Sequence, residues 1–187
     1  MKIMAAFGDE AVAGYTIGIR VLIFTILPAW GMANAAATLV GQNLGAKQPD
    51  RAEKSVWLTG LYNMIFLVFV SIIFFIGADF MMQFFTQDPV VAAGGAKGLR
   101  IMCLGYVAYG YGMVVSASFN GAGDTRTPMF INMFCFWLIQ IPLAYVMAHH
   151  WGFAESGAYW AIAISESVLA VIAIYLFKKG KWKTVNI

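Results

Sequence analysis

The stretch from Val56 to Ala78 reads VWLTGLYNMIFLVFVSIIFFIGA and contains no charged residue. A transmembrane α-helix needs about 20 consecutive, mostly apolar residues to cross the hydrocarbon core of a bilayer. Backbone N–H and C=O groups in that core must be paired within the segment itself, which a helix achieves. The stretch therefore predicts a helix that spans a membrane.

The composition of the whole chain agrees with this interpretation. Of its 187 residues, 61% are hydrophobic and 11% are charged, whereas soluble domains carry about 25% charged residues. So few charged residues cannot supply the polar surface that a water-soluble domain needs. The composition excludes a secreted disulfide scaffold, a nucleic-acid-binding module and most soluble enzymes, and it favours an integral membrane protein.

Four further apolar runs are long enough to cross a bilayer, and each predicts another spanning helix. The expected fold is an all-α membrane protein with five transmembrane helices, followed by a basic tail at residues 178–187. The expected spans are residues 12–40, 56–78, 99–119, 129–148 and 157–177.

Polar residues mark where several of the helices begin. Asp88 precedes Pro89, and Thr127 precedes Pro128. Both pairs are typical of an N-cap followed by proline at the first helical position, where the missing N–H does no harm. Ser156 is the expected N-cap of the last span.

Basic residues gather in the loops after the first and third spans and in the tail after the fifth. Cytoplasmic loops of membrane proteins carry an excess of lysine and arginine. We therefore expect these loops and the C-terminus to be cytoplasmic, and the N-terminus to lie outside. The residues on the expected cytoplasmic side are Lys47, Arg51, Lys54, Arg126, Lys178, Lys179, Lys181 and Lys183.

Two glycine-containing turns follow alternate spans. Residues 41–52 read GQNLGAKQPDRA, and residues 119–128 read FNGAGDTRTP. Glycine lets a backbone reverse without a Cβ clash, and Asp124 and Thr125 can bond nearby backbone groups. On composition alone, both turns are well-made helix connections.

These two turns, together with AVAGYTIGIR at residues 11–20, resemble stretches of the multidrug and toxic compound extrusion (MATE) family. The resemblance extends over essentially the whole chain. The turn residues that carry it are Gly41, Gln42, Asn43, Gly45, Asn120, Gly121, Gly123, Asp124, Thr125, Arg126 and Pro128.

The resemblance implies a fold larger than this chain. Members of the family have twelve helices in two six-helix bundles, related as parallel repeats. The five spans resemble helices eight to twelve, and residues 1–10 resemble the end of helix seven or the loop after it. The chain is thus expected to be a partial C-terminal bundle, to which the missing N-terminal bundle is a needed partner.

The resemblance also implies a function. Family members are antiporters that exchange H⁺ or Na⁺ for organic cations, drugs or other amphiphiles by alternating access. It implies no cofactor beyond the coupling ion, no metal site, and a place in the plasma membrane, which is the inner membrane of a bacterium. Acidic residues bind the coupling ion on helix one, or on helices seven and ten, in family members. The span at residues 99–119 has no interior acid, so that ion site does not carry over.

Two charged residues lie well inside the expected spans, where charge is costly and marks candidate functional sites. Glu166 is near the middle of its span. It could bind a proton, a cation or a cationic drug, or it could be a hydrogen-bonded glutamate inside one bundle. Arg20 could extend to the outer interface or pair with Glu166, and we favour a structural role for it.

Other candidates are uncharged. Asn34, Thr38 and Gln42 recur every four residues and form a polar stripe, which must face protein or water rather than lipid. The stripe could line the cavity or form hydrogen bonds within the bundle, and we favour the second. Tyr106 and Tyr109 could offer aromatic faces to organic cations. Kinks are expected at Pro28 and near Gln140 and Pro142, since proline removes a backbone donor.

Alternatives to drug export remain open. Lipid-linked saccharide flippases share the fold in outline, although the basic residues here are not central. A truncated membrane interaction subunit that does not transport is a second alternative. We expect no enzyme, because the sequence has no nucleophile–base set, phosphate loop or cluster of metal ligands.

Overall fold

Helical segments make up nearly all of residues 2–184, which the computed structural model describes. They are α1 (Lys2–Ala5), α2 (Asp9–Gly45), α3 (Pro49–Phe85), α4 (Pro89–Gly121), α5 (Arg126–Asn132), η1 (Met133–Gln140), α6 (Ile141–His149), α7 (Ser156–Lys178) and η2 (Lys181–Thr184).

The prediction of five membrane-spanning helices is confirmed. α2, α3, α4, the continuous α5–η1–α6 helix and α7 are each long and apolar enough to cross a bilayer. All five extend beyond the expected spans, and the longest three have 37 residues in α2, 37 in α3 and 33 in α4. At 1.5 Å per residue they exceed a hydrocarbon core of about 30 Å. These helices must tilt or extend beyond it.

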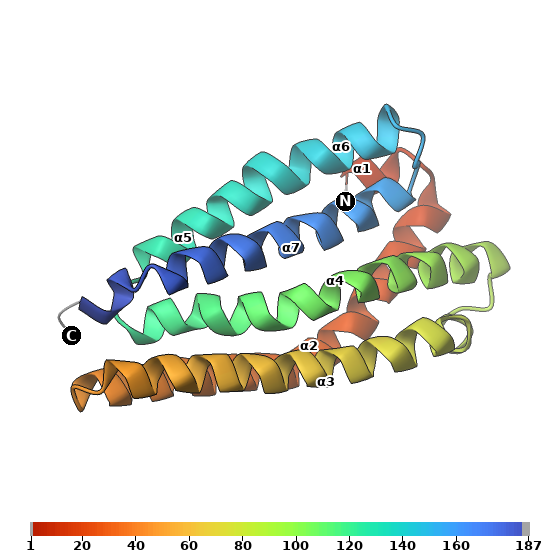
Figure 1. Cartoon of the computed structure of the whole chain (residues 1–187). Helices are drawn as coiled ribbons and strands as arrows, with labels where there is room; N and C mark the ends of the chain where they lie inside the picture. Colours follow the sequence, from red (N-terminus) through yellow and green to blue (C-terminus); the bar gives the residue numbers. More distant parts are fainter. Residues whose placement is uncertain (1, 185–187) are drawn as a thin grey trace.

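Helix α4 forms the centre of the bundle. It packs against α2, α3 and α7, while α5–η1–α6 packs on the far side of α7 (Figure 1). Small residues permit the close approach. A Cβ added at Gly112 would lie 2.7 Å from the Cα of Ala170 on α7. Small side chains at such contacts let membrane helices pack tightly in lipid, where the hydrophobic effect no longer drives association.

The helix starts were only partly predicted. The Asp88 side chain accepts hydrogen bonds from the N–H groups of Val90 (2.8 Å) and Val91 (3.3 Å), so this N-cap is confirmed. The start at Thr127 is wrong, because α5 begins at Arg126. Here the Asp124 carboxylate accepts both the N–H (3.1 Å) and the hydroxyl (2.6 Å) of Thr127.

The expected cap at Ser156 is also wrong. Ser156 is itself the first residue of α7, with Glu155 in the N-cap position. Its hydroxyl oxygen is buried and has no hydrogen-bond partner among the residues that the structure describes. A residue inside the first turn does not reach back to the N–H groups that a cap must satisfy.

The fourth span departs from a single regular helix. Residues Met133–Gln140 form a π-helix between two α-helical parts. Ile141 donates its N–H to the Phe136 carbonyl, five residues earlier. Pro142 has no N–H and therefore cannot make the next α-helical hydrogen bond. The expected break near Gln140 thus takes the form of a change in hydrogen-bond register.

Helix α2 continues through Pro28. The first part of α2 runs at a steep angle to α3, and its later part runs along α3 (Figure 1). The first turns of α2 pack on the start of α4, where a Cβ added at Gly14 would lie 3.0 Å from the Val91 carbonyl oxygen.

One end of the bundle collects the α2–α3 turn, the α4–α5 turn and the start of η2 (Figure 1). The predicted basic segments therefore share one end, although their cytoplasmic position stays a prediction. Lys183 links two of these segments. Its ammonium lies 2.6 Å from a Glu53 carboxylate oxygen and 3.3 Å from one of Asp50 on α3.

We expect Lys183→Met to lower the free energy of unfolding by less than about 1 kcal/mol, since the ion pair is partly exposed. The hydrogen bonds to Glu53, and then to Asp50, raise the pKa of Lys183. A lysine whose pKa is higher in the folded than in the unfolded protein stabilises the fold at pH values below its ordinary pKa. This stabilisation is lost as the pH rises through the pKa of the folded state. The difference should therefore vanish in strongly alkaline solution. Chemical unfolding in detergent measures it, and Lys54→Met is the control. An equal loss in both variants would contradict the prediction.

Candidate functional site

Glu166 lies on α7 with its side chain turned toward the bundle interior. Its Oε2 atom is buried and has no hydrogen-bond partner within residues 2–184. The neighbouring serines do not compensate it, because the hydroxyl of Ser165 donates to the Ile162 carbonyl (3.0 Å) and that of Ser167 to the Ala163 carbonyl (2.7 Å). An unpaired carboxyl group inside a membrane span is costly and is a candidate functional group.

Two cavities meet at Glu166. The larger is a cleft of about 430 Å³, and the smaller is a pocket of about 120 Å³. Tyr109 on α4 also lines both. Glu166 and Tyr109 therefore stand where the two spaces adjoin.

The larger cleft carries the polar groups. Its uncharged polar side chains come from three helices: Asn34 on α2, Ser116 and Asn120 on α4, and Asn132 on α5. Helix α2 packs mainly on α3 and α4, whereas α5 and η1 pack on α7 and on each other. The cleft occupies the space left between α2 and α5–η1.

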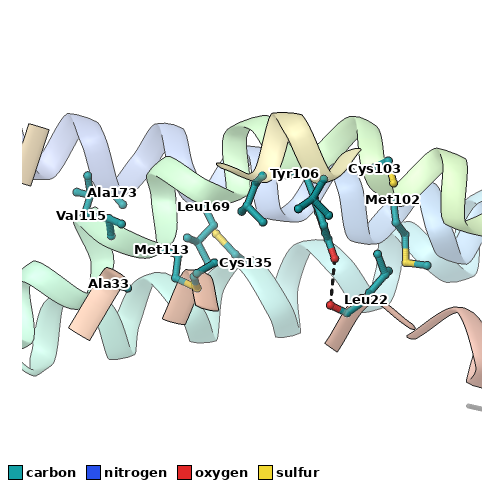
Figure 2. Packing of buried hydrophobic residues seen from close by; sticks show 14 of the residues in the cluster. Leu22, Ala33, Met102, Cys103, Tyr106, Met113, Val115, Cys135, Leu169 and Ala173 are labelled. Atoms are coloured by element: carbon teal, nitrogen blue, oxygen red, sulfur yellow. Dashed lines mark hydrogen bonds between the residues drawn. The ribbon is translucent and has the colours of Figure 1, made fainter. Parts of the chain in front are cut away.

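The smaller pocket is apolar and aromatic. Tyr106, Tyr109 and Met102 line it from α4, opposite isoleucine and leucine side chains of α2. The Tyr106 hydroxyl donates to the Leu22 carbonyl of α2 at 3.4 Å (Figure 2). The rings of Tyr106 and Tyr109 are stacked, with centroids 6.3 Å apart. Aromatic faces beside a carboxyl group form a surface suited to an organic cation.

The predicted polar stripe of α2 is exposed along its length. Asn34 reaches the cleft. The Thr38 hydroxyl donates to the Asn34 carbonyl at 3.0 Å, within its own helix. Gln42 lies near the end of α2, exposed and outside the lining of the cleft. The stripe thus runs away from the site rather than into the bundle.

Arg20 does not pair with Glu166. It is exposed on α2, and the ion pairs within residues 2–184 join Arg100 to Asp79 and Lys183 to α3. The alternative in which Arg20 pairs with Glu166 is therefore wrong. The Oε2 atom of Glu166 is buried at α7, whereas Arg20 is exposed on α2.

The two motif turns lie together at one end of the bundle. A Cβ on Gly41 would lie 3.1 Å from the Gly121 carbonyl oxygen, which shows how closely the two turns approach. Asn43 is buried and donates to the Leu39 carbonyl at 2.7 Å. Gly123 has a φ of +79°, a conformation that favours glycine. These residues shape the turns.

The other motif residues divide between surface and cleft. Gly45 and Arg126 are exposed, and Thr125 occupies the N-cap position of α5 without a side-chain hydrogen bond. Asn120 and Pro128 line the larger cleft. Only part of the motif therefore reaches the candidate site.

The lining of the larger cleft also includes Trp30, Asn132 and Phe136, which were not predicted. Asn132 could have been identified from the sequence, since it is a polar residue within an apolar run. Aromatic residues are common throughout these spans, so nothing in the sequence separated Trp30 and Phe136 from lipid-facing residues.

Five helices that are long and apolar enough to cross a bilayer define the class: an integral membrane protein built as a helical bundle. The MatE family model matches residues 1–146. The chain therefore belongs to the MATE family, as its two turns indicated. Glu166 lies beyond the residues that the family model matches.

Individual relatives match more of the chain. It is 27% identical over 183 residues to the "Probable multidrug resistance protein NorM" of Thermotoga maritima, covering 97% of this chain and 39% of that protein. The protein of the same name from Pseudomonas aeruginosa is 26% identical over 189 residues, covering 98% and 38%. The chain thus spans about two fifths of the length of these relatives.

The fold matches that of solved transporters. A mutant of the Vibrio cholerae MATE transporter VcmN superposes with a TM-score of 0.90 at 19% identity, covering 98% of this chain and 42% of that chain. At this identity the match establishes the bundle fold and carries no information about ligands.

Proposed function

We propose that this chain forms part of a cation-coupled exporter of organic cations, drugs or other amphiphiles. The observation that carries the proposal is the Glu166 carboxyl group, which is unpaired, buried at Oε2 and placed between two cavities. Transporters bind coupling ions near the middle of the membrane, at groups that helices direct into a cavity. The names of the relatives support an export role rather than an enzymatic one.

Glu166 binds the coupling cation, either H⁺ or Na⁺. Either ion removes the energetic penalty of an unpaired buried charge. The stacked Tyr106 and Tyr109 rings contact the exported cation in the smaller pocket. Because Glu166 lines that pocket too, ion and substrate compete for one carboxylate.

Export requires a second bundle. In alternating access one bundle rocks against another around a site at their interface. The exposed stripe of Asn34, Thr38 and Gln42 supports such a partner, since polar groups in a span must face protein or water. The basic end of the bundle faces the cytoplasm under the positive-inside rule, and the protein resides in a plasma membrane.

Liposomes that contain this chain alone should show no ion-driven ethidium efflux, because a single bundle cannot alternate its access. Adding an N-terminal MATE bundle should restore efflux. The assay records ethidium fluorescence after an imposed H⁺ or Na⁺ gradient, and protein-free liposomes set the baseline. Robust efflux from the chain alone would contradict the two-bundle proposal.

Failure of the added bundle to restore efflux, although the two parts co-purify, would favour a non-transporting interaction subunit. A saccharide flippase is less well supported. Large anionic headgroups call for basic groups in the cavity, whereas the described lining of the larger cleft contains no lysine or arginine.

A further inference from the structure

The π-helical segment η1 stands beside the candidate site. It spans Met133–Gln140, and its Phe136 lines the larger cleft together with Glu166. Such π-helical segments are rare and occur frequently at functional sites. The hydrogen bonds of this segment also differ from those of the α-helices on either side, so it has an alternative register available.

A hydrogen bond joins η1 to the helix of Glu166. The Ser165 hydroxyl lies 3.0 Å from Oε1 of Gln140, the last residue of η1. Ser165 is completely buried, and Glu166 follows it directly. The same hydroxyl is within 3.0 Å of the Ile162 carbonyl, so the donor is shared between α7 and η1. A shared donor is more easily released than one with a single partner.

Packing holds the two elements together as well. Cys135 of η1 is fully buried, and it points toward Met113 of α4 and Leu169 of α7 (Figure 2). A shift of η1 would therefore alter its packing on α4 and on α7, which both contribute to the lining of the cleft.

We propose that Gln140 is a positioning residue that couples the charge on Glu166 to the register of η1. The coupling rests on the cation site of the proposed function. When Glu166 carries a proton or cation, Oε1 of Gln140 accepts the hydrogen bond from the Ser165 hydroxyl, and η1 keeps its π-helical hydrogen bonds. When Glu166 is ionised and unpaired, the Gln140 amide, which has two N–H donors, turns to the carboxylate and η1 loosens.

The physical basis is a difference in interaction between two states. An ion shifts a conformational equilibrium only through its different affinity for the two conformations. Here the ionised Glu166 carboxylate has no hydrogen-bond donor while η1 is intact. It gains the Gln140 amide as a donor when η1 loosens. A shift of one residue in a helix rotates the following side chains by about 100°. Such a rotation would move α6 relative to the cleft.

The titratable groups near Glu166 are few in the described part of the chain. Tyr106 and Tyr109 face it from α4, and Cys135 faces it from η1. The residues of α2 and α5 that line the two cavities carry no ionisable side chain. Changes between acidic and neutral pH that require Glu166 therefore report on its own carboxyl group.

Hydrogen exchange of the whole chain in lipid nanodiscs tests the coupling. Protection factors for residues 137–141 should fall by about tenfold as pH rises through the titration of Glu166. The loss of the infrared band of the protonated Glu166 carboxyl group follows that titration. Glu166→Gln should keep residues 137–141 protected at every pH. Gln140→Leu and Ser165→Ala should retain the infrared titration but lose the change in protection. Ser167→Ala, the other flanking serine, should behave as the unmodified chain.

Each remaining outcome counts against the proposal. Constant protection in the unmodified chain, with a normal infrared titration, overturns the coupling and leaves the proposed cation site intact. A change that persists in both Gln140→Leu and Ser165→Ala shows that the link does not run through Gln140. Absence of any Glu166-dependent infrared band contradicts the proposed cation site, and the coupling with it.

Discussion

Glu166→Gln should lower cation-driven efflux at least tenfold in the transporter assembled with an N-terminal bundle, a loss of about 1.4 kcal/mol or more in barrier height. Glutamine keeps the shape of the side chain but neither binds a proton at this position nor carries a charge for Na⁺. The bundle itself should tolerate the change. The carboxyl Oε2 has no partner to lose among the described residues, and removal of an unpaired charge from a span is not costly.

The measurement is ethidium efflux at equal protein levels, with unfolding temperature recorded for each variant. Glu155→Gln is the matched control, because Glu155 lies at the start of α7, outside the two cavities that Glu166 lines. Unchanged efflux with normal folding would assign Glu166 a structural role. Lost efflux with a much lower unfolding temperature would also count against a specific role in coupling.

Gly121→Val should lower the free energy of unfolding by about 3 kcal/mol, because the turn after α4 has no room for a side chain. A Cβ at Gly121 would collide with the Ala37 carbonyl oxygen of α2, and it would lie 2.7 Å from the Ala37 carbonyl carbon and 2.8 Å from its Cα. These are backbone atoms, so relief requires the two helices to separate. The contact joins the last residue of α4 to the backbone of α2, which explains a glycine at this position.

Thermal unfolding in detergent, followed by circular dichroism, measures the effect. Gly121→Ala should lie between the unmodified chain and Gly121→Val. Gly31→Ala on α2 is the control, since nothing lies within 4 Å of its added Cβ, and alanine favours a helix over glycine by about 1 kcal/mol. Equal stability of Gly121→Val and Gly31→Ala would show that α2 and α4 do not approach as closely as described.

Much of the fold could be predicted from local features of the sequence. A run such as Val56–Ala78 has one stable state in a bilayer, because each backbone group must bond within the segment. The same reasoning located all five spans. The helix boundaries could not be predicted from the apolar runs. A polar first turn such as Pro49–Ser55 belongs to the helix but not to its apolar run.

The candidate site could be predicted only in part. A carboxyl group is costly in an apolar span wherever the helix packs, so Glu166 could be identified, and Asn34, Tyr106 and Tyr109 were candidates that do line the two cavities. Other neighbours could not be identified. Asn132 and Trp30 join it in one cleft, yet they come from α5 and α2, far apart along the chain. Arg20 shows the reverse case, since a charge suggested a pair with Glu166 that the packing does not form.

The five spans, the shared end of the basic segments and the family follow from local features of the chain, because hydrophobicity, charge and turn chemistry act along short stretches of it. Only the packing of the helices shows that Glu166 and Tyr109 both line two cavities, and that Ser165 donates to Gln140. The π-helical form of the break near Pro142 was not evident from the sequence either. These features depend on contacts between helices, and helix–helix distances in lipid are set by side-chain fit rather than by hydrophobicity.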